Sequence, residues 1–178
     1  YVFSAYPQYE LMNMEVVADE FNAFRFPDVD DIDLDEMVEV AEAMGANVLI
    51  LGNIASLRAD LFAMNLRFFS ARTNELRQVN FNVANLKETR WKQLNESLMA
   101  ELDRFISTEV DRIFNVATNF YAGAKYADAE SQLQTAIGLD PGNVDAYYYL
   151  GATYYKTDRY ALAETSFNQA LELDPTHY

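Results

Sequence analysis

Residues 110–143 read VDRIFNVATNFYAGAKYADAESQLQTAIGLDPGN, and residues 144–177 read VDAYYYLGATYYKTDRYALAETSFNQALELDPTH. When the two 34-residue segments are laid over each other, eleven positions are identical. The first members of these identical pairs are Val110, Asp111, Tyr121, Tyr126, Ala127, Ala129, Glu130, Ala136, Leu139, Asp140 and Pro141. Eleven identities at one spacing indicate an internal repeat, in which each segment forms the same structural unit.

Small residues recur at fixed places in both segments, between larger apolar ones. Ala117 and Gly151 occupy the same place, where a small side chain allows a second helix to come close while larger neighbours fill the space. Pro141 and Pro175 each follow Leu-Asp and end a helix, because proline fixes φ and lacks an amide donor. Each segment is therefore predicted to be a helical hairpin. The predicted second helices are Tyr126–Leu139 and Tyr160–Leu173.

This period and pattern closely resemble the tetratricopeptide repeat. In the first segment the pattern is carried by Ile113, Val116, Ala117, Phe120, Ala129, Leu133, Ala136 and Pro141. In the second it is carried by Tyr147, Leu150, Gly151, Tyr154, Ala163, Phe167, Ala170 and Pro175. The resemblance implies an all-α stack of hairpins that binds another polypeptide. A single hairpin of this kind cannot bury its apolar face alone and needs neighbours.

The resemblance also implies a concave groove lined mainly by the first helix of each repeat. The corresponding residues are Asp111, Phe114, Asn115, Thr118, Tyr121 and Ala122, then Asp145, Tyr148, Tyr149, Ala152, Tyr155 and Lys156. Members of the family that bind a chain-terminal carboxylate place Lys, Asn and Arg at these positions, whereas Phe114 and Thr118 stand here. We therefore expect a neutral, aromatic groove for an extended or helical peptide, without a charge clamp.

The remaining aromatic residues are assigned to packing. The repeat register predicts that Tyr147, Tyr154 and Tyr160 lie in the core.

The second helix of the second repeat is predicted to leave an uncovered edge. The residues of that edge are Leu162, Phe167 and Leu171. A continuation of the chain, a second copy or a different protein could cover this edge, and the sequence favours the first.

Composition narrows the function. The 178-residue chain carries a formal net charge of −15, and such an acidic balance argues against nucleic-acid binding and against an anionic membrane surface. It has no cysteine, and no apolar run is long enough to span a bilayer. The single histidine, His177, cannot build a triad or a histidine metal pair. We expect a non-enzymatic protein without a cofactor. Because it begins at Tyr1, we also expect a mature or truncated piece.

An acid-rich run precedes a predicted helix over residues 34–44. Asp33 and Glu36 have the spacing of a capping box, and Gly45 is expected to stop the helix. The expected buried stripe is Leu34, Met37, Val38, Ala41 and Met44. An alternative is a calcium loop, with ligands at Asp31, Asp33, Asp35 and Glu42. Glu36 stands where such a loop requires glycine, which disfavours calcium.

Strand patterns follow this helix. The continuous apolar run 46–55 predicts a strand covered on both faces. Residues 61–71 and 76–83 predict an antiparallel hairpin, with Val79, Phe81 and Val83 facing inward. Residues 86–106 predict a long helix, with Trp91, Leu94, Leu98, Leu102 and Phe105 as its apolar stripe. Upstream, a short strand at 9–12 and a helix at 14–24 are expected.

The strand at Gly45 to Ile54 and the turn Ala71-Arg-Thr-Asn-Glu75 carry a second resemblance. They look like the α/β domain of the curli-secretion (CsgG-like) family and of the TolB amino-terminal family, over residues 9–106. The opening strand and helix of such domains are missing or reduced here. This resemblance implies a protein of the bacterial periplasm or outer membrane that acts in assembly or transport, and it implies no catalytic residues. A cytoplasmic location is the alternative.

The sequence thus predicts an α+β fold: a small α/β domain with a mixed sheet over 1–106, then two helical repeats over 107–178. Capping residues at 107–111 place the boundary there, although the apolar register also fits one continuous helix. The predicted function is a scaffold that binds a protein partner through the aromatic groove. The alternatives are a ring, a homo-oligomer assembled through the α/β domain, and a ligand- or calcium-regulated binding module.

Overall fold

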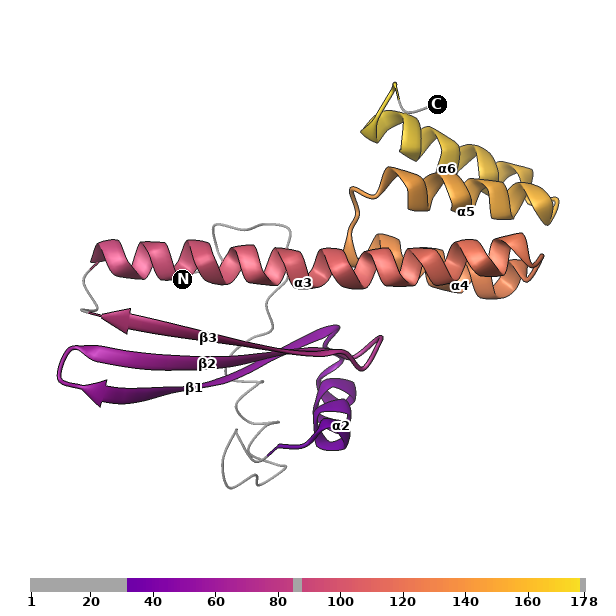
Figure 1. The fold of residues 1–178 in the computed structure, drawn as a ribbon. Helices are drawn as coiled ribbons and strands as arrows, with labels where there is room; N and C mark the ends of the chain where they lie inside the picture. Colours follow the sequence, from indigo (N-terminus) through magenta and orange to yellow (C-terminus); the bar gives the residue numbers. More distant parts are fainter. Residues whose placement is uncertain (1–31, 85–87, 177–178) are drawn as a thin grey trace. The chain divides into compact units, whose positions relative to one another are not determined.

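The computed structural model describes residues 32–84 and 88–176 (Figure 1). The strand expected at 9–12 and the helix expected at 14–24 lie outside these residues, as does the side chain of Trp91. The chain divides into two compact units, Tyr1–Phe105 and Ile106–Tyr178.

The first unit contains a three-stranded sheet in the order β1-β2-β3. Its strands are β1 (Val48–Arg58), β2 (Leu61–Ser70) and β3 (Leu76–Ala84). Both neighbouring pairs are antiparallel, which confirms the predicted hairpin of β2 and β3. The small sheet followed by helical hairpins confirms the α+β fold class. The described strands do not show the mixed pairing that we expected.

The strand covered on both faces is β2, not β1. Phe68 and Phe69 point to opposite faces of the central strand, and both are fully buried. Ile54 on β1 is instead 59% exposed, so the prediction of a doubly covered β1 is wrong. The reason is that β1 is covered on one face only: its buried residues, Leu49 and Leu51, are two apart, share a face and belong to the cluster with α2. On β3, Val79, Phe81 and Val83 are less exposed than their neighbours, as predicted.

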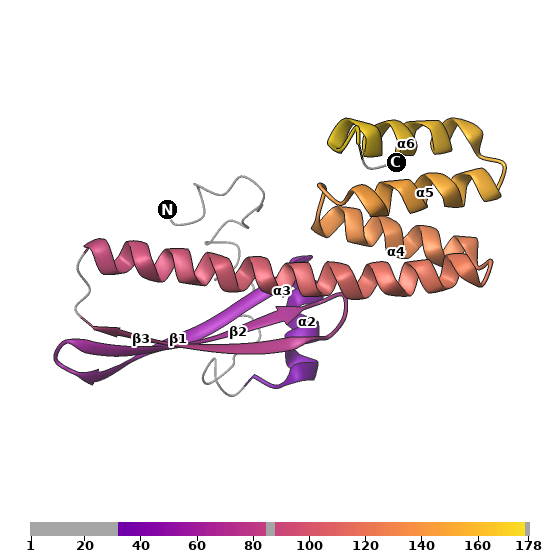
Figure 2. The same cartoon turned by 45° about the horizontal axis from the view of Figure 1, so that its top comes forward.

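Helices pack on both faces of this sheet. On one face α2 (Leu34–Met44) buries Met37, Val40, Ala41 and Met44 against a cluster that includes Phe69. The first part of α3 (Glu88–Ala122) runs along the other face (Figure 2). There Phe105 stacks on Phe68, with ring centroids 5.9 Å apart. Leu34 is exposed, so it is not part of the predicted stripe.

The ends of α2 follow the predicted signals. Asp33 accepts a hydrogen bond from the Glu36 amide, and Glu36 accepts one from the Asp33 amide, both at 2.9 Å. This reciprocal pair is the capping box. Gly45 ends the helix with φ of +64°, a left-handed conformation that glycine adopts without a Cβ clash.

The second unit consists of two hairpins that stack side by side (Figures 1 and 2). The last part of α3 pairs with α4 (Tyr126–Leu139), and α5 (Val144–Lys156) pairs with α6 (Tyr160–Leu173). The bounds of α4 and α6 are those predicted from the repeat. The capping residues at 107–111 do not interrupt α3, so the alternative of one continuous helix is correct.

The two hairpins turn in the same way. Ala124 and Asp158, 34 residues apart, both adopt positive φ, of 57° and 60°. After each hairpin, the carboxylate of Asp140 or Asp174 accepts a hydrogen bond from the amide two residues later, at 2.9 Å. This side-chain turn explains why Asp precedes Pro in both repeats.

Within each hairpin, a small residue on the first helix faces a large one on the second. A Cβ added to Gly151 would lie 2.8 Å from the ring of Phe167, which is closer than atoms normally approach. At the equivalent places in the first hairpin stand Ala117 and Leu133, both fully buried. The larger Ala is thus matched by the smaller Leu, and the smaller Gly by the larger Phe.

We predict that Gly151→Ala lowers the free energy of unfolding by about 1 to 3 kcal/mol, because the added methyl overpacks the α5–α6 contact. Adding Phe167→Leu, which copies the first hairpin, should recover at least half of the loss. Urea unfolding followed by far-ultraviolet circular dichroism measures both.

Gly138→Ala is the matched control for this change. A Cβ at Gly138 meets no atom within 4 Å, so this variant should gain up to about 1 kcal/mol of helix propensity. Full stability of Gly151→Ala, or no recovery in the double variant, would contradict the packing account.

Candidate functional site

Four of the predicted groove residues form one connected aromatic group. Tyr149 on α5 contacts Phe114 and Tyr121 on α3, with ring centroids 5.5 and 5.6 Å apart. It also contacts Tyr148 at 5.7 Å. All three contacts are edge-to-face, the arrangement that the aromatic quadrupole favours. Each of these rings is half-buried, so each keeps an accessible portion.

The other predicted groove residues are mostly polar and mostly exposed. Thr118 donates a hydrogen bond to the Asn115 carbonyl at 3.0 Å, within α3. Ala152 is half-buried on α5. The exposed members are Asp111, Asn115, Ala122, Asp145, Tyr155 and Lys156. The binding of a peptide by these residues stays a prediction.

Second-helix aromatics extend the group and were not in the predicted set. Tyr126 on α4 contacts Tyr121 at 5.8 Å, and Phe167 on α6 contacts Tyr148 at 5.6 Å. Phe167 is therefore not part of the uncovered α6 edge, whereas Leu162 and Leu171 are exposed as predicted. The signal in the sequence was the recurrence of a large residue opposite Ala117 and Gly151.

The core assignment of three tyrosines was correct for one of them. Tyr154 is buried, and Tyr147 is half-buried. Tyr160 is 57% exposed, so its core assignment is wrong. It begins α6 beside Tyr155, with centroids 5.6 Å apart, and its hydroxyl donates to the Asp158 carboxylate at 2.6 Å. A solvent-facing partner therefore holds the ring outside the core.

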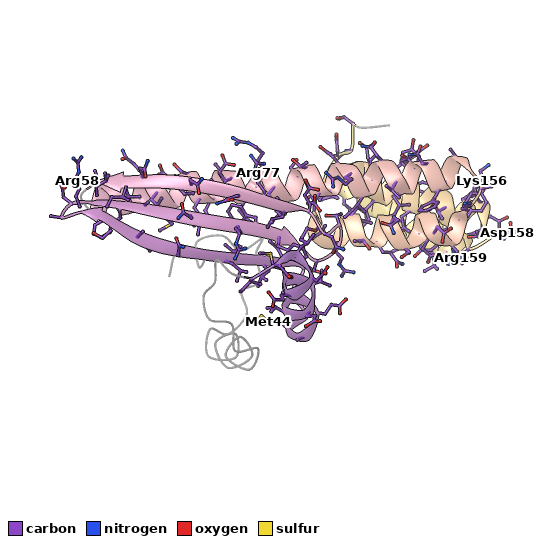
Figure 3. The ribbon with its side chains drawn as sticks, turned by 60° about the horizontal axis from the view of Figure 1, so that its bottom comes forward. Met44, Arg58, Arg77, Lys156, Asp158 and Arg159 are labelled. Atoms are coloured by element: carbon purple, nitrogen blue, oxygen red, sulfur yellow. The ribbon has the colours of Figure 1, made fainter. Side chains whose placement is uncertain are left out.

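A charged cluster joins the first hairpin to the second. Arg159 lies in the α5–α6 turn, next to Asp158 (Figure 3). It donates two hydrogen bonds to Glu130 of α4, at 3.0 and 2.6 Å. The Arg159 guanidinium also lies 4.5 Å from the centre of the Tyr154 ring. Gln134 donates to the Tyr154 hydroxyl at 3.2 Å. This two-pronged geometry makes the contact both strong and directional.

The cluster changes the acidity of its members. The hydrogen bonds from Arg159, opposed by partial burial, hold the pKa of Glu130 below its ordinary value of 4.5. Burial raises the pKa of the Tyr154 hydroxyl, so it stays neutral at physiological pH. The sequence contained a signal for this cluster, because Lys125 and Glu130 recur as Arg159 and Glu164 one repeat later.

The calcium hypothesis is not tested by these residues. Asp33 is engaged as the helix cap, and Asp31 lies outside the described part of the chain. Within residues 32–84 and 88–176, no cluster of three or more acidic or histidine side chains is arranged to hold a metal ion. Calorimetry that detects no heat on calcium addition would rule the hypothesis out.

Within residues 32–84 and 88–176, every helix is too short or too polar to cross a bilayer.

Comparison with known proteins assigns the second unit. The model of the tetratricopeptide repeat family matches residues 116–178. No curated protein matches the chain. The match, together with two stacked hairpins at a spacing of 34 residues, shows that the carboxy-terminal segment consists of tetratricopeptide repeats. Such repeats are protein–protein interaction modules.

We predict that Glu130→Gln lowers the free energy of unfolding by roughly 1 kcal/mol at neutral pH, because a neutral amide cannot hold Arg159 in the same way. A folded-state pKa below 4.5 means that the stabilisation is complete above pH 4.5. It disappears as the pH falls through the folded pKa. Urea titrations of both proteins across this range measure the difference.

Arg159→Lys is the matched control, since it keeps the charge and removes the fork of donors. It should fall between wild type and Glu130→Gln at neutral pH. If wild type exceeded Glu130→Gln in free energy of unfolding by the same amount in acid as at neutral pH, the stabilisation would not come from the ion pair.

Proposed function

We propose that this protein is a non-enzymatic adaptor that binds a partner polypeptide through the aromatic face of α3 and α5. The observation that carries the proposal is the connected group of half-buried rings, centred on Tyr149, on a segment of tetratricopeptide repeats. Half-buried aromatics offer a large contact area, and their packing holds them in place before a ligand arrives. Binding then costs little side-chain entropy.

The chemistry of the face favours a ligand with apolar anchors. Lys156 is the only cationic residue among the predicted groove residues, and it stands at the end of α5. Asp145 lies in the first turn of α5, and Asp111, its equivalent one repeat earlier, lies within α3. A ligand that inserted Leu or aromatic side chains between the rings would bury apolar area without requiring a charged clamp. Asp111 and Asp145 would repel strongly acidic peptides.

The first unit gives the proposal its cellular setting. The resemblance is carried by the segment from Gly45 to Ile54, which contains the stop of α2 and most of β1, and by residues 71–75, which lie between β2 and β3. We therefore propose that the adaptor acts in a bacterial cell-envelope assembly, with residues 1–106 as one domain and 107–178 as the partner-binding one. This setting rests on the resemblance alone.

A peptide-display selection against the whole chain, followed by calorimetry with the selected peptides, tests the binding face. Tyr148→Ala with Tyr155→Ala should weaken binding at least tenfold, since two aromatic anchors are lost. The dissociation constant should change little with added salt, because no charge pair dominates the contact.

Ile54→Ala is the control, because Ile54 is as exposed as Tyr155 but lies on β1, outside the repeats. It should bind as wild type does. Equal affinity of the tyrosine double variant and wild type would remove the aromatic face from the proposal. Loss of binding in high salt would replace it with a charged site.

A second candidate is a ring assembled through the first unit. The observation in its favour is an exposed apolar end of β1, where Ile54 and Leu57 are 59% and 56% exposed. Side chains of this kind on an edge strand often mark an assembly surface. Ile54→Glu with Leu57→Glu should dissolve such an oligomer into monomers in sedimentation velocity. An unchanged sedimentation coefficient would exclude the ring.

A further inference from the structure

The contact between the two hairpins has two sides of defined composition. On α4 the side includes Glu130 and Gln134, and Ile137 packs against the hydrophobic cluster of the repeats. On the second hairpin it includes Tyr154 and Arg159, and Leu150 belongs to the same cluster. The Glu130–Arg159 ion pair and the Gln134–Tyr154 hydrogen bond join the two sides. The contact buries Leu150 and Tyr154 to 7% exposure each.

The first side of this contact is repeated on α6, where no described helix covers it. A shift of 34 residues converts Glu130, Gln134 and Ile137 into Glu164, Asn168 and Leu171. Ile137 is half-buried on α4, whereas Leu171 is 45% exposed. In Figure 2, α5 lies between α4 and α6, while α6 has a repeat helix on one side only. The acid, the amide and the aliphatic residue are therefore presented to solvent.

The second side is repeated at the opposite end of the stack, on the carboxy-terminal part of α3. The same shift converts Leu150, Tyr154 and Arg159 into Val116, Phe120 and Lys125. Val116 is 40% exposed, although its counterpart Leu150 is buried. The Lys125 ammonium lies 5.8 Å from the centre of the Phe120 ring, as Arg159 lies over Tyr154. The cation is thus already held at the place where an incoming carboxylate would meet it.

From these two complementary ends we propose that the repeats of one chain stack on those of a second copy, with α6 of one copy against α3 of the next. Glu164 of one copy then pairs with Lys125 of the other. Leu171 packs against Val116, the counterparts of Ile137 and Leu150, which belong to one hydrophobic cluster inside the molecule. The two surfaces differ, so the contact is head-to-tail and propagates into longer assemblies unless it closes into a ring.

Charge is the reason for choosing a second copy as the occupant. The α6 end presents an acid and the α3 end a base at the register positions that pair inside the molecule. The stacking contact is weaker than the internal one for two reasons. Lysine cannot form the two-pronged bond of arginine, and Phe120 has no hydroxyl to accept from Asn168. The net charge of −15 on each copy adds a general repulsion between copies. The association should therefore be measured near 0.15 M salt, where charges are screened beyond about 8 Å.

A charge swap at the two ends tests this stacking on the full chain. Sedimentation velocity of wild type up to about 1 mM should show a mass that grows with concentration. Glu164→Lys places like charges at the contact, as does Lys125→Glu, and each should associate about tenfold more weakly or worse. Both positions are exposed, and unchanged circular dichroism would verify that the variants fold.

Mixing the two single variants restores opposite charges at every contact, so the mixture should associate as wild type does. The chain with both substitutions should also recover. Wild type that stays monomeric over the whole range would overturn the proposal. Association that ignores the swap would overturn it as well, because it would then use another surface, such as β1. Peptide binding by the aromatic face does not enter this measurement, so the stacking proposal and the proposed function fail separately.

Discussion

The structure of the repeats depends on one contact, in which a residue almost without a side chain meets a large one across each hairpin. Gly151 lies against the ring of Phe167, and Ala117 occupies the same place opposite Leu133. This contact sets how closely the two helices of a hairpin approach. The same pairing of a small with a large residue recurs in both hairpins, and the rings of α3 and α5 meet at Tyr149.

A second constraint joins the hairpins into a stack. The Arg159 guanidinium contacts both the Glu130 carboxylate and the Tyr154 ring. Arg159 itself lies in the α5–α6 turn, directly after Asp158, which adopts a positive φ. The turn thereby positions the cation, and the cation holds the preceding hairpin. The same geometry, with Lys125 over Phe120, recurs at the end of the stack, where the proposed carboxylate partner is Glu164 of a second copy. One local motif therefore serves as an internal joint and as an external surface.

The repeat made the second helix of each hairpin predictable to the residue. A 34-residue period with Leu-Asp-Pro at each end fixes both bounds of α4 and α6, because the stop signals are local. Tyr160 was assigned to the core from the repeat register, whereas in the structure its ring lies beside Tyr155 and its hydroxyl donates to Asp158. In the first unit, an apolar run reveals a strand but not its neighbours. Residues 46–55 therefore looked like a central strand, although in the described sheet the central one is β2.

The candidate site was predictable as a set of positions but not as a set of contacts. The repeat register selected Phe114, Tyr121, Tyr148 and Tyr149, whereas their convergence through Tyr149 depends on the packing of two hairpins. The role of Tyr126 and Phe167 in supporting these rings also arises only in three dimensions. Aromatic-ring NMR of the chain during titration with a selected peptide tests the central claim most directly. The account predicts shifts of Tyr148, Tyr149 and Tyr155, with Phe68 unchanged. Shifts confined to the first unit, or none in the repeats, would contradict it.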